Sequence, residues 1–343
     1  MRAVQVVRHG APGEAVEVRD VDVPQPGPGM VRVAVRAASL NFGDIARCRG
    51  GVASVMAQPP FTLGMDVCGI VDAAGEGAAV APGTRVCAVT TMALGGIAEY
   101  ALAPAHSVFA APPELDDAEA AGFLLPYHVA HLALFRRARL VAGEHLLVVA
   151  AASGVGTAAI QLGVAAGAHV HAVARGADKA ELCRSLGATS VADPTTDDLF
   201  EHVLEATAGH GADVVFDLVG GTGTEALWTT IALEGRYVPV GFNDDPQSGL
   251  TGRPLRKVAM GNFSVIGVML SYNQAPPQVR RLGLHPYPPE VGAEIHAELL
   301  ALAAAGRIRP VIGRRIRMDD VGAALADHEA RRTSGRTVVL VGS

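Results

Sequence analysis

The sequence predicts an α/β protein with two domains, an irregular β domain and a domain built on a doubly wound parallel sheet. Short apolar runs separated by Gly-Pro and Pro-Gly pairs fill residues 1–120, whereas strand-like and helix-like segments alternate across residues 121–270. Such alternation favours a parallel sheet with right-handed crossovers. Mixed elements return in residues 271–343, which we expect to complete the first domain.

Length and composition agree with this division. The chain has 343 residues, half of them apolar, which is enough for a large core in each of two domains. Its net charge is −6 and it has no long basic run, which argues against an extended nucleic-acid surface. Residues 1–8 lack the apolar stretch of a signal peptide, and four scattered cysteines fit reduced thiols, so we expect a cytoplasmic protein.

The first domain is expected to consist mainly of short strands. Residues 1–8 form the first strand, and residues 31–37 alternate apolar and polar side chains as a half-buried strand does. Further strands are expected at residues 66–72, 85–89 and 97–103. The end of the chain adds a helix at 289–305, a strand at 309–312, a helix at 319–332 and a strand at 336–341.

In the second domain, strands and helices follow one another in turn. A buried strand begins at residue 145 and leads through a tight turn into a helix. Residues 146–168 are uncharged and long enough to span a bilayer, but four glycines and a change of periodicity indicate a strand and a helix rather than a membrane span. Later strands are expected at 169–174, 189–192, 212–218, 235–240 and 263–269, with helices at 178–186, 196–207 and 224–233.

The turn at residues 151–156 is the strongest functional signal in the chain. Its sequence is Ala-Ala-Ser-Gly-Val-Gly, and such small residues let the backbone approach a pyrophosphate at the start of a helix. We therefore predict that Ser153, Gly154, Val155 and Gly156 bind a dinucleotide. Two positions depart from the G-x-G-x-x-G pattern, so an ordinary strand–helix turn is the alternative for this motif taken alone.

Charge at the end of the second strand predicts the kind of dinucleotide. An NAD-binding unit carries an acidic residue there, which bonds the ribose 2′-hydroxyl. In this chain the strand ends before Arg175, and Lys179 lies one helical turn later. Because both cations attract a 2′-phosphate, we predict NADPH rather than NADH. Asp178 lies beyond the strand, where we expect it to cap the following helix.

Two later strand ends are also expected to line the cofactor site, because ligands of parallel sheets bind at the carboxyl ends of the strands. Plain strand-to-loop turns are the alternative for the two glycines. The residues predicted to bind the cofactor here are Leu218, Val219, Gly220, Gly241 and Phe242.

Several motifs along the chain resemble one protein superfamily, the medium-chain dehydrogenases/reductases, and within it the zinc-independent quinone oxidoreductases. The motifs are Met1-Arg2-Ala3-Val4, Asn41-Phe42-Gly43-Asp44, residues 64–71, 95–100 and 136–140, the turn at 151–156, and Ser185-Leu186-Gly187-Ala188. The resemblance covers nearly the whole length. It implies a GroES-like catalytic domain of residues 1–120 and 271–343, a Rossmann domain of residues 121–270, NADPH as cofactor, and a homodimer.

The same resemblance implies that the protein works without zinc. Zinc-dependent relatives have a Cys where this chain has Asn41 and a His where it has Met65. Neutral Asn and Met cannot replace thiolate and imidazole as zinc ligands. His128 and His131 have i, i+3 spacing, but without a third ligand we interpret them as residues of a helix face.

The catalytic residues implied by the resemblance are Asn41 and Asp44, near the nicotinamide. Asn41 is expected to bond the ribose or the acceptor carbonyl, and Asp44 either orients Asn41 or caps a short helix that begins there. Val129 stands where many relatives have a Thr facing the nicotinamide, and is expected to contact the cofactor. Ala46 stands where many have a Tyr. Tyr127 is nearby, either as a compensating hydroxyl or as a buried structural residue.

The implied reaction is hydride transfer from NADPH to a small molecule, either a quinone or another conjugated carbonyl such as an enone or enal. An enoyl-thioester reductase, acting on enoyl-CoA or an acyl-carrier protein, shares the fold and the cofactor. A non-catalytic NADPH-binding protein is the alternative of another class. Residues 271–289, with five prolines, form either a lid over the substrate or a surface excursion.

Overall fold

The computed structural model describes residues 1–51, 57–241, 256–274 and 277–342. The chain divides into two units: unit 1 contains Met1–Leu125 and Ser271–Ser343, and unit 2 contains Pro126–Leu270. The sequence of unit 2 is therefore inserted into that of unit 1. The predicted α/β class is confirmed. Within the described ranges, no helix combines the length and the apolar character needed to cross a membrane.

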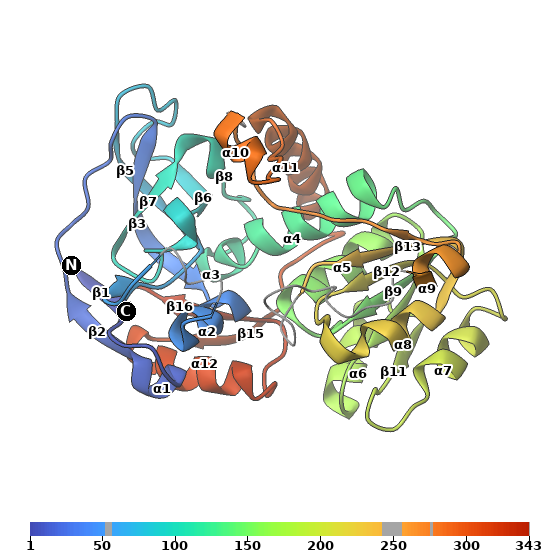
Figure 1. Ribbon diagram of the computed structural model, residues 1–343. Coiled ribbons are helices and arrows are strands. Elements are labelled where there is room, and N and C mark those ends of the chain that lie inside the picture. Colours follow the sequence, from blue (N-terminus) through green and yellow to red (C-terminus); the bar gives the residue numbers. More distant parts are fainter. Residues whose placement is uncertain (52–56, 242–255, 275–276, 343) are drawn as a thin grey trace. The chain divides into compact units, whose positions relative to one another are not determined.

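Unit 1 is built on two sheets (Figure 1). The small sheet has the order β2-β1-β4, with β1 at Arg2–Val6, β2 at Val16–Asp20 and β4 at Phe61–Thr62. The large sheet has the order β15-β16-β3-β5-β6-β8, and β7 pairs with β3. Its strands are β3 (Met30–Ser39), β5 (Asp66–Ala74), β6 (Arg85–Val89), β7 (Tyr100–Pro104), β8 (Val108–Ala110), β15 (Ile312–Ile316) and β16 (Arg336–Leu340).

Unit 1 also contains helices, several of which pack against these sheets. They are α1 (Pro12–Ala15), α2 (Phe42–Arg49), α3 (Asp117–Ala121), α10 (Pro277–Arg281), α11 (Pro289–Ala304) and α12 (Val321–Glu329), with short 3₁₀ turns at Thr91–Ala93, Ala105–Ser107 and Met318–Asp320. The core joins the inward side chains of β3 and β5 to α12, where Val321 and Leu325 are fully buried. Burial of this apolar face is what holds the C-terminal helix in place.

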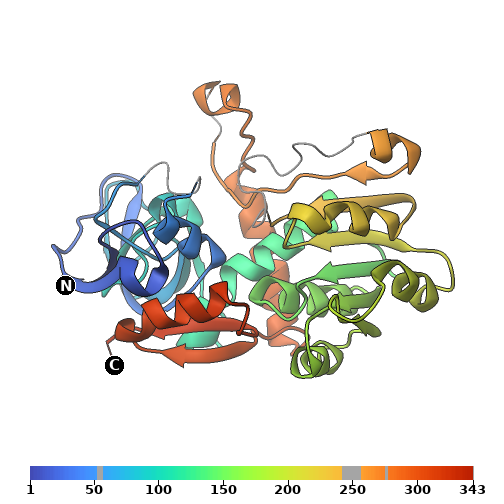
Figure 2. The ribbon, with the colours of Figure 1, turned by 60° about the horizontal axis from the view of Figure 1, so that its bottom comes forward.

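The C-terminal strand lies inside the large sheet rather than at its edge. β16 pairs antiparallel with β3, with Val338 opposite Ser39, and parallel with β15 on its other side. Figure 2 shows these two C-terminal strands beside the N-terminal part of unit 1. The strand expected at residues 309–312 begins later, at Ile312, where pairing with Arg336 begins.

Unit 2 contains a parallel sheet of the order β11-β10-β9-β12-β13-β14. The strands are β9 (His145–Val149), β10 (His169–Val173), β11 (Ser190–Ala192), β12 (Ala212–Asp217), β13 (Ile231–Pro239) and β14 (Ser264–Val265). The helices are α4 (Leu124–His131), which begins at the end of unit 1, then α5 (Gly154–Ala165), α6 (Ala177–Ser185), α7 (Leu199–Ala206), α8 (Thr224–Thr229) and α9 (Arg256–Met260), with a π-type turn at Leu132–Arg137 and a 3₁₀ turn at Gly221–Gly223. Helices α5 to α8 pack around the sheet (Figure 1).

Two local expectations for unit 2 were wrong. The helix expected at 224–233 ends at Thr229, because Ile231 already pairs with Ala212 as the first residue of β13. Asp178 is not the cap of α6: Gly176 takes that position, and its N–H donates to the carboxylate of Asp193 at 2.7 Å. Asp178 lies within the first turn of α6, and Asp193 bonds the N–H of the N-cap residue itself.

Candidate functional site

The turn after β9 has the geometry of a phosphate-binding turn. Ser153 is the N-cap of α5, and its Oγ accepts the N–H of Gly156 at 3.2 Å. The N–H groups of Gly154 and Val155, in the first turn, have no carbonyl partner within the helix. A Cβ at Gly156 would lie 2.5 Å from Ala150 O, so only glycine allows this close approach of backbone to backbone. The residues present therefore fit a pyrophosphate at the start of α5.

The two predicted cations follow β10. Arg175 is exposed, directly after the end of the strand, and Lys179 is half-buried in the first turn of α6. Gly176 between them has φ +84°, which turns the chain sharply into the helix. Sequence reasoning missed Asp193, which follows the neighbouring strand β11 and bonds Gly176.

A buried carboxylate organises the loop after β12. Asp217 is fully buried, and its Oδ1 accepts the N–H groups of Val219 at 2.8 Å and Gly220 at 3.1 Å. Its Oδ2 accepts the hydroxyl of Tyr237 at 2.6 Å. Asp217 therefore fixes the path of the three residues Leu218, Val219 and Gly220. Its place at a strand end was the only signal in the sequence for this role.

The loop after β13 packs against the loop after β12. Val240 N–H and Gly241 N–H donate to Asp217 O at 2.8 and 3.1 Å. A Cβ at Gly241 would overlap Leu218 O, so this position requires glycine. The two predicted strand ends thus meet at the same edge of the sheet. Phe242, also predicted to bind the cofactor, lies outside the described residues.

Residues of α4 differ in their burial. Val129 is half-buried, so part of its side chain is accessible. Tyr127 is 1% exposed, and burial raises the pKa of its hydroxyl. Burial of this kind agrees with the structural interpretation of Tyr127 rather than with a proton donor.

In unit 1, Asn41 lies in a buried polar network. Its Nδ2 donates to Asp66 Oδ1 at 2.7 Å, and its Oδ1 accepts Nη1 of Arg336 at 3.0 Å. Nη2 of Arg336 donates to Asp66 Oδ2 at 2.9 Å, which closes a ring of three side chains. Asp66 is fully buried, and Asn41 and Arg336 are nearly so. Both polar atoms of the Asn41 amide therefore have partners within the protein.

Asp44 completes this network from helix α2. Its Oδ2 accepts the N–H of Asn41 at 2.8 Å in a capping box, and its Oδ1 accepts Nη1 of Arg47 at 3.2 Å. Of the two roles expected for Asp44, the structure shows the capping role, at the start of α2. Burial raises the pKa of both Asp44 and Asp66, and the guanidinium groups of Arg47 and Arg336 oppose that shift.

The network does not fit a metal ion. Asn41 offers a neutral amide whose oxygen already bonds a guanidinium, and Arg336 brings a positive charge to the position that a cation would need. Across residues 1–51, 57–241, 256–274 and 277–342, no group of three His, Cys, Asp or Glu side chains is arranged to hold a metal, and this includes His128 and His131.

The segment 271–289 is tied to unit 1. Tyr272 is buried and packs edge-on against Phe109, with ring centroids 6.0 Å apart. The two ends of the segment are joined, because Tyr287 N–H donates to Ser271 O at 2.9 Å and Asn273 N–H donates to Tyr287 O at 2.8 Å. The excursion is therefore closed at its base.

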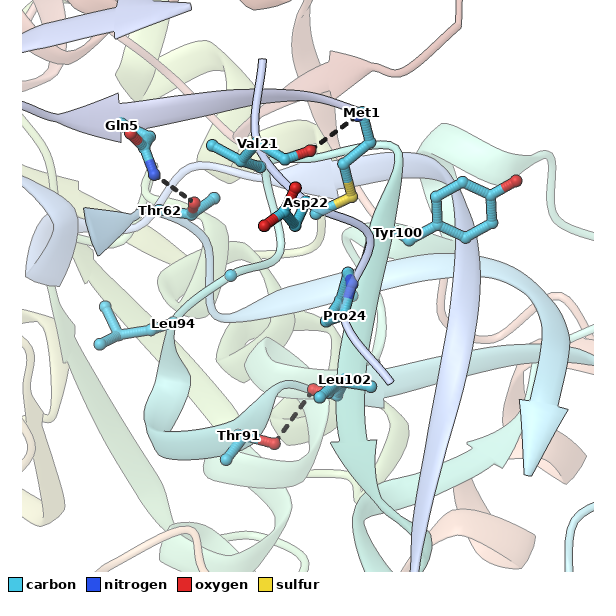
Figure 3. A pocket seen from close by; sticks show the side chains of 12 residues that line it. Met1, Gln5, Val21, Asp22, Pro24, Thr62, Thr91, Leu94, Tyr100 and Leu102 are labelled. Atoms are coloured by element: carbon cyan, nitrogen blue, oxygen red, sulfur yellow. Dashed lines mark hydrogen bonds between the residues drawn. The ribbon is translucent and has the colours of Figure 1, made fainter. Parts of the chain in front are cut away.

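Unit 1 also has a hollow of about 340 Å³ beside β1 and β7 (Figure 3). Its walls are fixed by bonds between loops and strands, such as Gln5 Nε2 to Thr62 Oγ1 at 3.5 Å and Thr91 Oγ1 to Leu102 O at 3.2 Å. None of the predicted site residues lines this hollow.

Comparison with known proteins identifies the family. Family models described as "Alcohol dehydrogenase GroES-like domain" and "Zinc-binding dehydrogenase" match residues 27–113 and 154–283. The mycobacterial protein Rv1454c, solved in complex with NADPH, is 28% identical with a TM-score of 0.85, and the match covers 99% of each chain.

Two curated relatives differ greatly in length. A mycocerosic acid synthase-like polyketide synthase of Mycobacterium tuberculosis is 32% identical over 71% of this chain, but the match covers only 12% of that protein. The quinone oxidoreductase of Lama guanicoe is 30% identical, and the match covers 99% of this chain and 98% of its own. The resemblance inferred from the motifs is thereby confirmed, and the chain belongs to the quinone oxidoreductase family of the medium-chain dehydrogenases/reductases.

Proposed function

We propose that this protein is an NADPH-dependent reductase that works without zinc and transfers hydride to a quinone or another conjugated carbonyl. The observation that carries the proposal is the pairing, in unit 2, of a turn shaped for pyrophosphate with Arg175 at the end of the next strand. A carboxylate at that strand end would repel a 2′-phosphate, whereas Arg175 attracts it. The relative solved with NADPH supports the same cofactor.

Each part of the cofactor has a proposed partner. Ser153, Gly154, Val155 and Gly156 hold the pyrophosphate through N–H groups and the positive end of α5. Arg175 and Lys179 hold the 2′-phosphate. The nicotinamide half is assigned to Val129, to the loop of Leu218, Val219 and Gly220, and to Gly241 and Phe242.

The chemistry belongs largely to the cofactor. Bound NADPH supplies a hydride, with its two electrons, and a proton taken up from water completes the reduction of a quinone to a hydroquinone. The chain provides binding and orientation. We assign Asn41 and Asp44 as positioning residues of unit 1, because their polar atoms are held by Asp66, Arg336 and Arg47.

Zinc independence is supported by the residue types and their bonds. Asn41 and Met65 replace the thiolate and imidazole of zinc-dependent relatives, and Arg336 supplies the positive charge that balances Asp66. Substrate polarisation is then left to hydrogen bonds and orientation, which suffices for an electron-poor quinone.

We also propose that the protein is cytoplasmic and that it forms a homodimer. Light scattering of the purified protein measures its molecular mass and so tests the homodimer directly.

An enoyl-thioester reductase is the second candidate. The match to part of a mycocerosic acid synthase-like polyketide synthase is the observation that favours it. The sequence argues against it, because Gly50-Gly51-Val52-Ala53 occupy the region where such a reductase usually has the Tyr that protonates the α-carbon.

One experiment separates these candidates. NADPH absorbance is followed after mixing the protein with benzoquinone, naphthoquinone, a 2-alkenal or crotonyl-CoA. The proposal expects oxidation with a quinone or the alkenal. Oxidation with crotonyl-CoA alone identifies a thioester reductase, and tight NADPH binding with no oxidation identifies a non-catalytic binding protein.

A further inference from the structure

A carboxylate lies where the proposed 2′-phosphate site begins. β10 and β11 are parallel neighbours, with Val173 opposite Ala192, so the residues that follow them meet at one edge of the sheet. Asp193 follows β11 directly and its Oδ2 accepts the N–H of Gly176, the residue after Arg175, at 2.7 Å. The chain thus places its own anion beside the cation that we assign to the cofactor phosphate.

Asp193 is held firmly in this position. Its Oδ1 accepts the N–H of Thr195 at 2.9 Å and the Thr195 hydroxyl at 2.6 Å, and its own N–H donates to Asp197 Oδ2 at 2.8 Å. The bonds from Thr195 and Gly176, and the charge of Arg175, lower the pKa of the Asp193 carboxyl. Asp193 therefore carries a negative charge at neutral pH and has little freedom to move aside.

This charge affects the two nicotinamide cofactors differently. A 2′-phosphate approaching Arg175 meets a like charge, and the Gly176 N–H that an anion would use is already bonded. A ribose with a free 2′-hydroxyl meets a carboxylate that can accept its proton in a hydrogen bond. Asp193 thus lowers affinity for NADPH and favours NADH, against the effect of Arg175.

We propose that Asp193 is a specificity-determining residue, an internal anion that weakens the preference for NADPH over NADH. The inference rests on the proposed function, since it assumes that Arg175 faces the cofactor ribose. It goes beyond that function because it assigns cofactor selectivity to two opposite charges, Arg175 after β10 and Asp193 after β11. Arg175 alone does not determine the selectivity.

The test compares the wild-type protein with the variants Asp193→Asn and Asp193→Ser. Dissociation constants and kcat/KM are measured for NADPH and NADH, with the unfolding midpoint as a check of folding. Both variants are expected to raise the NADPH:NADH ratio of kcat/KM about tenfold, mainly through tighter NADPH binding. Glu181→Gln, an exposed charge later on α6, is the matched control and is expected to leave the ratio unchanged.

The outcomes separate this inference from the proposed function. A wild-type protein that binds neither cofactor overturns both. A protein that binds NADPH, but whose ratio stays the same in both Asp193 variants or shifts equally in Glu181→Gln, overturns the role of Asp193 alone. If Asp193→Asn does not fold, the Ser variant decides the question, because it removes the charge with a smaller side chain.

Discussion

At the scale of single residues, an arginine of unit 2 and an arginine of unit 1 have different roles, one in binding and one in stability. Arg175 is exposed and contributes little to folding, so we expect its charge to act mainly on a ligand. Arg336 is buried and holds both Asn41 and Asp66. Its removal leaves a carboxylate in the core without its main counter-charge, which is costly.

Replacing Arg175 tests the cofactor assignment. Arg175→Ala is expected to weaken NADPH binding by roughly 1–3 kcal/mol, the range for hydrogen bonds to charged groups, and to change NADH binding very little. Calorimetric titration of both cofactors measures the difference. Equal losses for NADPH and NADH would refute the assignment of Arg175 to the 2′-phosphate.

Replacing Arg336 tests the buried network. Arg336→Leu is expected to lower the free energy of unfolding by about 3–5 kcal/mol, because it removes the guanidinium that balances the buried Asp66 carboxylate. Adding Asp66→Asn to that variant is expected to recover part of the loss. Arg332→Leu, which removes an exposed arginine paired with the half-buried Asp327, is the control, with a loss below about 1 kcal/mol in urea unfolding. Similar losses for both arginines would contradict the network's importance.

At the scale of elements, the strand–turn–helix unit at β9 and α5 combines packing with binding. Gly163 faces the sheet, where a Cβ would lie 2.8 Å from the Leu146 side chain and 2.9 Å from that of Val170. Helix and strands therefore approach closely, and the same closeness brings the first turn of α5 against the end of β9. This geometry depends on two glycines, Gly156 and Gly163, which lie about two turns apart on one face of α5.

A methyl group at Gly156 is expected to disturb the turn. Gly156→Ala places a Cβ 2.5 Å from Ala150 O and 2.6 Å from Ala151 O, so the backbone must shift. Cofactor affinity is expected to fall at least about tenfold, with a loss of stability of roughly 1–3 kcal/mol. Gly223→Ala is the control, since nothing lies within 4 Å of a Cβ there. Unchanged NADPH affinity in Gly156→Ala would count against the turn as the binding element.

The opposite edge of the same sheet carries a cluster of histidines. His145 Nδ1 and His171 Nε2 lie 2.9 Å apart, and the His169 ring stacks on that of His145 with centroids 5.1 Å apart. Burial lowers the pKa of His171 to about 4, and the neighbouring histidines add to that shift. The other groups facing the cluster are Ser190, His202, His210 and Asp213.

This cluster is expected to make the folded protein less stable at acidic pH. Below pH 6.5 the unfolded chain takes up a proton at His171 that the folded protein resists, so stability falls as the pH drops from about 6.5 towards 4. His145 acts in the same direction, while Asp213 opposes its shift. His171→Asn is expected to reduce the acid-induced loss by roughly 2 kcal/mol, seen in unfolding midpoints between pH 7 and 4.5. The exposed His285→Asn is the control, and an identical acid profile for both variants would disprove the role of the cluster.

At the scale of the whole molecule, the sequence predicted what is local and periodic. The order of strands and helices in unit 2 and the turn at 151–156 follow from patterns a few residues long. The contact of Asp66 with Arg336 joins positions 270 residues apart, and no local pattern encodes it. Asp193 was missed for the same reason, because its partner Gly176 lies in the loop after β10 and Asp193 lies after β11. The end of α8 was misplaced because pairing of Ile231 with β12 overrides helical propensity.

The insertion of unit 2 into unit 1 has a consequence for how the protein is made. A ribosome adds about 5–20 residues per second, so on the order of tens of seconds pass between the emergence of Leu125 and that of β16. During that time unit 2 can fold, while the half-made sheet of unit 1 exposes the flank of β3 that β16 later covers. An open strand edge can pair with another chain, so we expect unit 1 to be most prone to aggregation in this interval before β16 emerges.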